Sequence, residues 1–210
     1  MRRALAALAL AAVAFASSAI AAPLASDMAI GAKTAKVEVV EYASLSCPHC
    51  RELHQTVLKD IRAKYVATGK VRWVFREFPT EPIVMAVAGF QLARCKNADP
   101  KTYFDRLDAI FDAQPKILEA MKTGQGRVTF EQLAPSVGVT AAEFDACLMD
   151  EAASPRINEA VQQAGKDGVT GTPTLMVAGK VIPFEDNTIE GVSRQIDAAL
   201  AAAARARQRK

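Results

Sequence analysis

The sequence contains few histidine, cysteine and aromatic residues. Its 210 residues include two histidines, four cysteines and one tryptophan, and aromatic residues make up only 6%. Four cysteines are too few to hold together a disulfide-rich miniprotein. A composition that is 50% hydrophobic and 23% charged excludes general disorder, and the length suits one compact domain with a subdomain at most.

The sequence also lacks a field of basic charge on its central part. The formal net charge is +3, from 26 basic and 23 acidic residues. Six of the basic residues lie at the two ends of the chain, which leaves 20 basic residues against 23 acidic ones between them. Nucleic-acid binding needs clustered Lys and Arg, so we expect no nucleic-acid partner. The six basic residues near the two ends are Arg2, Arg3, Arg205, Arg207, Arg209 and Lys210.

Residues 1–21 have the pattern of a cleavable signal peptide. A basic start is followed by an apolar run over 4–16, and the small residues Ala19 and Ala21 predict cleavage after Ala21. The alternative is a membrane anchor, since the uncharged stretch over 4–26 is long enough to span. Alanine dominates this stretch and buries little apolar area, which favours cleavage. We therefore expect export to the periplasm, an oxidising compartment in which disulfides persist.

Short apolar segments predict strands over 37–42, 71–76, 174–177 and 181–184. A helix pattern follows the first strand and ends at Gly69, so the first two strands are expected to form a right-handed parallel crossover. A turn over 178–180 predicts an antiparallel hairpin between the last two strands. The sequence therefore predicts a mixed α/β sheet.

The chain from about 83 to 164 has helical signals only. Thr129 with Gln132 and Thr140 with Glu143 have the spacing of capping boxes. A last helix is expected from about Val192, with a basic tail over 198–210 that frays. One sheet can contain all the strands only if the helical block is an insertion between them.

The motif Cys47-Pro48-His49-Cys50 lies between a predicted strand and a predicted helix. A helix start offers unpaired N–H groups and the positive end of the dipole, so Cys47 should have a stabilised thiolate and a depressed pKa. Pro48 fits the first helical turn, and a protonated or hydrogen-bonding His49 would add to the stabilisation. Cys50, one turn further along, is expected to be the shielded resolving thiol.

Thiolate stabilisation favours the reduced form over the disulfide. Each unit of pKa depression below the ambient pH is worth about 1.4 kcal/mol, or about 30 mV for a two-electron couple. A depressed pKa of Cys47 therefore makes its disulfide with Cys50 more oxidising and makes Cys47 a good leaving group.

Three other interpretations of the motif are weaker. A c-type haem site needs His directly after the second Cys, where this chain has Arg51. A zinc site using Cys47, Cys50 and His54 would lack a fourth ligand, so we expect no metal and no other cofactor. A purely structural bridge in so short a loop would be easily reduced.

A second marker, Gly171-Thr172-Pro173-Thr174, precedes a predicted strand. Together with Cys-Pro-His-Cys after a strand, it makes roughly residues 35–197 resemble the DsbA-like proteins of the thioredoxin-fold oxidoreductases. The resemblance implies a thioredoxin fold over 22–81 and 166–197 with an all-helical domain inserted over 82–165. It also implies that Pro173 is a cis-proline facing the cysteines and that Thr172 tunes them.

Glu41 lies six positions before Cys47, at the end of the first predicted strand. By itself it could be a solvated carboxylate. The resemblance implies a buried acid beneath the cysteines that helps proton transfer at the resolving Cys50. Burial would raise its pKa and suit it to take a proton from Cys50 through water.

Cys95 and Cys147 both fall in the helical block. They could be free buried cysteines, but in an oxidising compartment an even pair within one subdomain favours a structural disulfide. Such a loop would stabilise the fold by about 4 kcal/mol in the chain-entropy model.

The resemblance implies a periplasmic, monomeric dithiol oxidase that acts on reduced or unfolded exported proteins. A quinone-linked membrane partner would reoxidise it. The alternative is a reductase or isomerase that uses the same Cys47 and Cys50, and Thr172 before the proline also occurs in such family members. The absence of a long N-terminal dimerisation domain favours the oxidase, and a non-catalytic holdase chaperone is a weaker third hypothesis.

Overall fold

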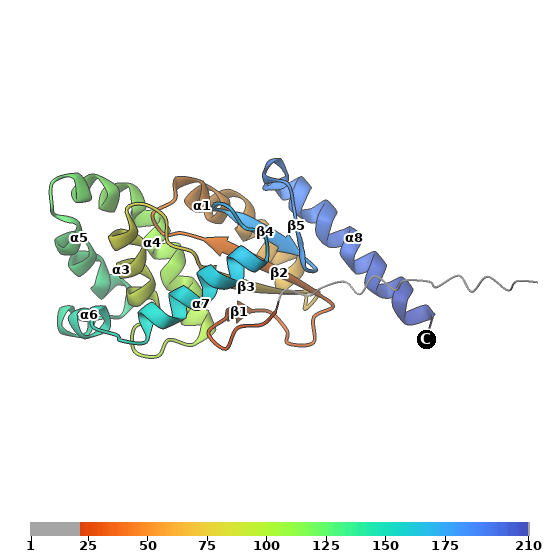
Figure 1. Ribbon diagram of the computed structural model, residues 1–210, viewed down its shortest axis with the longest axis horizontal. Helices are drawn as coiled ribbons and strands as arrows, with labels where there is room; N and C mark the ends of the chain where they lie inside the picture. The colour runs from red at the N-terminus through yellow and green to blue at the C-terminus, as the bar shows by residue number, and fades with distance from the viewer. Residues whose placement is uncertain (1–21, 210) are drawn as a thin grey trace, which may run out of the picture.

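A five-stranded mixed sheet forms the centre of the computed structural model, which describes residues 22–209 (Figure 1). The predicted signal peptide lies outside the described residues. The two long central strands are parallel to each other, and the other neighbouring strands pair antiparallel. The spatial order is β1-β3-β2-β4-β5, with bounds β1 (Met28–Ile30), β2 (Val37–Ala43), β3 (Val71–Glu77), β4 (Thr174–Val177) and β5 (Lys180–Val181).

Both faces of β2 are buried, which explains its almost continuous apolar sequence. Side chains alternate between the two faces of a strand. Val39 packs into the large core cluster beneath the first helix, and Val40 and Tyr42 pack into a smaller cluster with Ala164 on the opposite face. Glu41 is on the same face as Val39 and is fully buried. The strand therefore carries a carboxylate into the core just below the cysteine motif.

One continuous helix follows the cysteine motif and connects β2 to β3. Its α-helical turns α1 and α2 alternate with wider π-helical turns η1 and η2, and Gly69 with positive φ follows its end, as predicted. The bounds are α1 (Pro48–Glu52), η1 (Leu53–Leu58), α2 (Lys59–Ile61) and η2 (Arg62–Val66).

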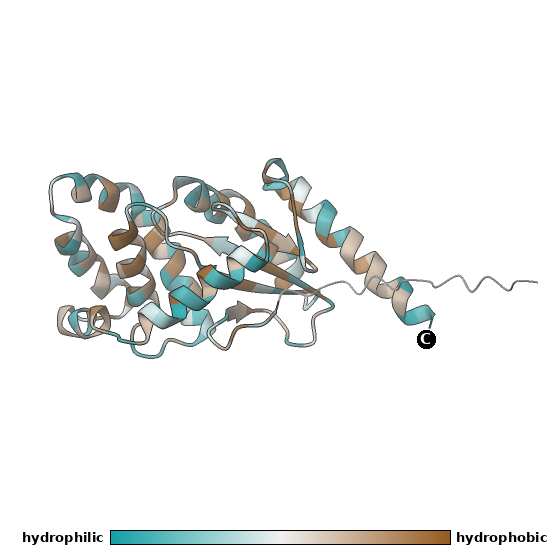
Figure 2. Ribbon diagram, viewed as in Figure 1, coloured by the Kyte–Doolittle hydropathy of each residue, from teal (hydrophilic) through white to brown (hydrophobic). Residues whose placement is uncertain are grey.

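The predicted helical block lies mostly at one end of the sheet (Figure 1). The predicted capping box of Thr140 and Glu143 is confirmed, whereas Thr129 lies inside a helix and its hydroxyl donates to the carbonyl of Gln125. Figure 2 shows α3 as the most hydrophobic helix of this end, and most of its residues are buried. The helices are α3 (Ile83–Arg94), α4 (Pro100–Lys122), α5 (Gly126–Leu133), the short η3 (Ala134–Val137), α6 (Ala141–Leu148) and α7 (Ala153–Lys166).

The mixed sheet with a helical insertion confirms the predicted fold class. The domain limits at 82 and 165 stay a prediction. α7 leaves the helical end and crosses the sheet, where Ala164 packs against Tyr42 and Met176. No helix within residues 22–209 combines the length and the apolarity needed to cross a membrane.

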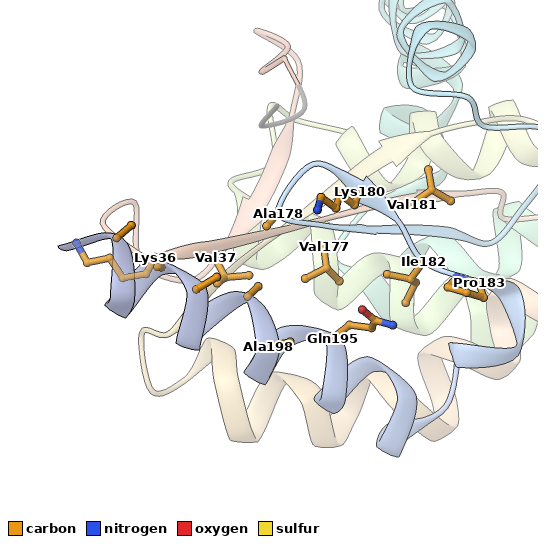
Figure 3. Close-up of a pocket in the computed structure, with 14 residues that line it drawn as sticks. Lys36, Val37, Val177, Ala178, Lys180, Val181, Ile182, Pro183, Gln195 and Ala198 are labelled. Carbon is orange, nitrogen blue, oxygen red and sulfur yellow. The ribbon is translucent and has the colours of Figure 1, made fainter. Parts of the chain in front are cut away.

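The C-terminal helix α8 (Ile189–Gln208) differs from its prediction. It begins at a Thr188 cap and continues to Gln208, so the prediction that the basic tail frays is wrong. Alanine is the strongest helix former, and the run over 201–204 propagates the helix. Figure 3 shows that α8 leaves a groove beside the edge of the sheet, lined by Val177 and Ile182 on one side and by Ala198 on the other.

Two further differences concern strands. β1 pairs with β3 although its three residues carry no sequence signal long enough to predict a strand. The last strand, β5, stops at Val181 instead of 184, because Pro183 and the short η4 (Phe184–Asp186) turn the chain toward α8.

Candidate active site

Cys47 is the N-cap of α1, at the end of the loop that leaves β2. The backbone N–H of Cys50 donates to its Sγ at 3.4 Å, and Pro48 occupies the first helical turn, where no N–H is needed. The pKa of Cys47 falls from 9.0 to about 5, chiefly because the Cys50 side chain donates to its sulfur. Burial opposes the fall, and hydrogen bonds from the side chain of Thr172 and from the backbone N–H groups of Cys50 and His49 add to it.

Cys50 lies one turn further in and has no exposed surface. Burial raises its pKa well above 9.0, and the hydrogen bond to Cys47 and the negative charges of Cys47 and Glu41 act in the same direction. The backbone N–H of Ser44 donates to its Sγ at 3.5 Å and lowers the pKa only in part. The two thiols are free and both buried, with Cys47 8% exposed and Cys50 fully covered. They differ chiefly in acidity, since the pKa of Cys47 is lowered and that of Cys50 is raised.

The loop that precedes β4 faces Cys47 from across the site. The Thr172–Pro173 peptide bond is cis, and the Cys47 thiol donates to the carbonyl oxygen of Thr172 at 3.3 Å. Only the protonated thiol can make that bond, whereas the thiolate accepts from the helix N–H groups. The structure thus brings together two segments that are 125 positions apart in the sequence.

The imidazole of His49 is exposed and contacts Glu52 and Phe184. Its side chain is 66% exposed, its Nδ1 lies 3.7 Å from Glu52, and its ring packs edge-on against Phe184. The part of His49 that acts on the pKa of Cys47 is its backbone N–H. The predicted tuning by the imidazole of His49 therefore stays a prediction. His49, Leu53, Pro173, Phe184 and Ile189 line an open groove beside the cysteines.

Glu41 is buried below the motif, but its carboxylate has close partners. Oε1 lies 3.0 Å from Nε2 of His54, and Oε2 accepts a hydrogen bond of 2.9 Å from Nε1 of Trp73. The other ring nitrogen of His54 lies 3.1 Å from Asp108, a residue of α4 that also forms an ion pair with Arg62. A buried charge needs such partners, because an isolated carboxylate is costly in the core.

The inserted helix α4 supports the motif from behind. The amide of Gln114, itself buried, donates to the carbonyl oxygens of Leu45 at 2.9 Å and Cys47 at 3.0 Å. Pro115 has no N–H for the carbonyl of Phe111 four residues earlier, and Arg51 donates to that carbonyl at 3.1 Å instead. Arg51 directly follows the motif, so a break in the hydrogen bonds of α4 anchors the start of α1.

Cys95 and Cys147 form a disulfide within the helical block. Cys95 follows the end of α3 and Cys147 lies in the last turn of α6, with 52 positions between them. This bond is at the helical end of the molecule, and it joins helices that do not carry Cys47 or Cys50.

Sequence reasoning missed most of the groups that surround the cysteines. The sequence patterns suggest His54 only as a possible metal ligand, and they do not point to Trp73, Asp108 or Gln114. One signal was available. His54 lies four positions after Cys50 and therefore on the same side of the helix, where a buried Glu41 requires a partner.

The sequence profile of a known family, described as Thioredoxin, matches residues 24–198. The chain belongs to the thioredoxin family. Among solved structures, this thioredoxin-family chain is similar in fold to alpha-DsbA1 of Wolbachia pipientis, with a TM-score of 0.73 and 24% identity. The match covers 86% of this chain and 94% of that one, so the helical insertion is part of the shared fold.

Two relatives have similar sequences. A Rickettsia prowazekii protein named as a protein-disulfide oxidoreductase is 32% identical over 175 residues, which are 83% of this chain and 61% of that protein. A Bacillus anthracis protein named as disulfide bond formation protein D is 25% identical over 175 residues, which are 81% of this chain and 78% of that protein. The chain thus spans about three fifths of the length of the rickettsial relative.

Proposed function

We propose that this protein is a thiol:disulfide oxidoreductase that oxidises cysteine pairs in exported proteins through a Cys47–Cys50 disulfide. The observation that supports this most strongly is the opposite shift of the two thiols: the pKa of Cys47 falls to about 5, whereas that of Cys50 rises. A stabilised thiolate at the N-terminal end of a helix makes the reduced enzyme the favoured product.

The reaction balances over two exchange steps. A substrate thiolate attacks Sγ of Cys47, the Cys47–Cys50 bond breaks, and the bonding electron pair passes to Cys50, which takes up a proton. A second substrate thiolate then attacks the substrate sulfur of the mixed disulfide, and Cys47 leaves as its thiolate. The substrate loses two electrons and the enzyme gains them.

The surroundings of Cys47 support a protein substrate. The groove beside the motif contains Leu53, Pro173, Ile189 and the half-exposed Phe184, which suit apolar side chains of an unfolded segment. The carbonyl of Thr172 beside Cys47 would accept a backbone N–H of a bound chain. The predicted signal peptide supports action in the periplasm. The reduced protein must be reoxidised, and the resemblance to the DsbA-like proteins supports a quinone-linked membrane partner for that step.

The direction of the reaction is tested by redox equilibrium with glutathione. Thioredoxin, whose reactive cysteine has a pKa of about 7, has a reduction potential of about −270 mV. A Cys47 pKa near 5 predicts that the Cys47–Cys50 couple is about 60 mV more oxidising. A potential at or below that of thioredoxin would contradict the oxidase and favour a reductase. Preferential reshuffling of scrambled disulfides over oxidation of a reduced substrate would favour an isomerase, and protection from aggregation without exchange would favour a holdase.

A further inference from the structure

His54 is a buried titratable group that the exchange steps above do not use. It links a carboxylate in the core to one that reaches the surface: Nε2 lies 3.0 Å from Glu41, and Nδ1 lies 3.1 Å from Asp108. The side chains of His54 and Glu41 are 1% and 0% exposed, but that of Asp108 is 41% exposed. The imidazole is therefore a bridge between the interior and the solvent.

The two contacts constrain the protons of this bridge. A neutral imidazole has one donor nitrogen and one acceptor nitrogen, so it can donate to only one of two carboxylates. Both contacts are hydrogen bonds if His54 is protonated, or if one of the two carboxyl groups carries the proton. Moving one proton along the row Glu41, His54, Asp108 therefore preserves both hydrogen bonds.

The charged groups around His54 favour its protonated form. Burial lowers its pKa, but the charge of Glu41 and the hydrogen bonds with Asp108 and Glu41 outweigh burial and the charge of Arg62, so the pKa is raised. The rings of Phe75 and Phe111 cover the other sides of the imidazole. The outer end of the bridge opens into a shallow surface pocket, whose further charged lining residues are Lys59, Arg62 and Asp112.

Cys50 is a thiol that needs such a connection. It has no exposed surface and a pKa raised well above 9.0, so the sulfur released when the disulfide opens must be protonated inside the protein. The charge of Glu41 acts on Cys50. Glu41 in turn has His54 on one oxygen and Trp73 on the other.

We propose that His54 relays the proton of Cys50 between Glu41 and the surface carboxylate Asp108. When the disulfide opens, the bonding electron pair goes to Cys50, which receives a proton by way of Glu41. Glu41 is reprotonated by His54, and His54 by Asp108 and solvent. When the disulfide forms again, the proton leaves along the same row. The inference rests on the proposed function, because it concerns the resolving cysteine of that exchange.

The relay is tested by the pH profile of the reduction of the oxidised protein by a small dithiol. Trp73, the one tryptophan of the sequence, donates to Glu41 and supplies a fluorescence signal next to the relay. We expect His54→Gln to slow reduction about 100-fold at neutral pH, as for the loss of a general acid, and to remove the pH dependence that His54 contributes. Asp108→Asn should give a smaller loss in the same part of the profile.

Asp112→Asn is the matched control. Asp112 lies one turn further along α4 and lines the same pocket, and within residues 22–209 its hydrogen-bond partner is the exposed Gln55. Its replacement should therefore leave the profile unchanged. If His54→Gln does not fold, the pH profile of Asp108→Asn tests the relay instead, because a substitution at this partly exposed side chain disturbs the fold less. A wild-type profile in Asp108→Asn and His54→Gln overturns the relay, and so does an equal loss at every pH, which is the sign of a merely structural role.

The failure of the relay can be told from the failure of the proposed function. If the wild-type protein does not exchange disulfides with a dithiol, the proposed function fails. The relay still predicts that Trp73 fluorescence of the reduced wild-type protein titrates with pH and that His54→Gln shifts this titration. A fluorescence titration that His54→Gln leaves in place contradicts proton sharing with Glu41.

Discussion

Cys47 and Cys50 lie three positions apart at the start of a helix, whereas Cys95 and Cys147 join two helices of the insertion across 52 positions. The first pair has N–H groups aimed at one sulfur and a buried acid below the other. In the second pair, Cys95 is buried among the apolar side chains of the insertion and Cys147 packs against them. Under the proposed function, the environment of the thiolate, more than the presence of a partner cysteine, decides between exchange and structural bonding.

The largest expected effect comes from breaking each pair in turn. Cys47→Ser should abolish exchange with a reduced substrate, because no attacking or leaving thiolate remains at the start of α1. The double variant Cys95→Ala with Cys147→Ala should keep exchange but lose about 4 kcal/mol of stability, from the loop that the disulfide closes. Oxidative refolding of a reduced substrate and urea unfolding measure the two effects. Loss of exchange in the folded double variant would contradict the division of roles.

A second prediction sharpens the contrast through pH. The ultraviolet absorbance of the thiolate in the reduced protein should titrate with a midpoint near pH 5, the pKa of Cys47. Because the folded pKa is depressed from 9.0, the thiolate contributes stability that is present above the unfolded pKa and is lost as the pH falls toward 5. The free energy of unfolding of the reduced protein should therefore rise as the pH increases from about 5 to about 9.

The matched control for the pH prediction is Cys47→Ser, whose reduced form should lack both the titration and that rise. The Cys95–Cys147 disulfide contributes no thiolate, so the double variant without it, once reduced and folded, should keep the midpoint of Cys47. A midpoint near that of a free thiol would mean that the helix start does not stabilise the thiolate.

The parts of the molecule that local patterns determine could be predicted from the sequence. β2 and β3 are covered on both faces, so their apolar runs identify them, and the capping box at Thr140 marks the start of α6. The tail was predictable in principle, since alanine favours a helix even where little packs against it. β1 was not, because three residues gain their strand conformation only by pairing with β3.

The candidate site likewise has a part that could be predicted from the sequence and a part that could not. The strand–motif–helix order places Cys47 at a helix start, and this follows from neighbouring residues alone. The approach of Asp108 to His54, and of Gln114 to the loop before the motif, depends on how α4 packs against α1. These contacts join residues 54 and 69 positions apart, and single-sequence patterns carry no information about such distances.

The smallest expected effect comes from replacing one of two buried glutamines, each of which lies beside one cysteine pair. Gln114 donates to the carbonyls of Leu45 and Cys47, and Gln91 of α3 donates at 2.9 Å to the carbonyl of Leu148, next to Cys147. Gln114→Leu leaves two buried carbonyls without that donor, and Gln91→Leu leaves one part-buried carbonyl without it. Each loss costs about 1–3 kcal/mol. Urea unfolding should show a similar loss of stability for both variants.

Exchange should distinguish the two variants even though their stabilities are alike. The carbonyls released in Gln114→Leu belong to the loop that positions the N-cap, so we expect a slower reaction of Cys47 with a small disulfide and a higher midpoint of its thiolate titration. Gln91→Leu should leave the reaction rate and the titration midpoint of Cys47 unchanged, because Leu148 lies beside the Cys95–Cys147 disulfide. If both variants slow exchange equally, the helical insertion couples the two cysteine pairs, and their separation into an exchanging and a structural pair does not hold.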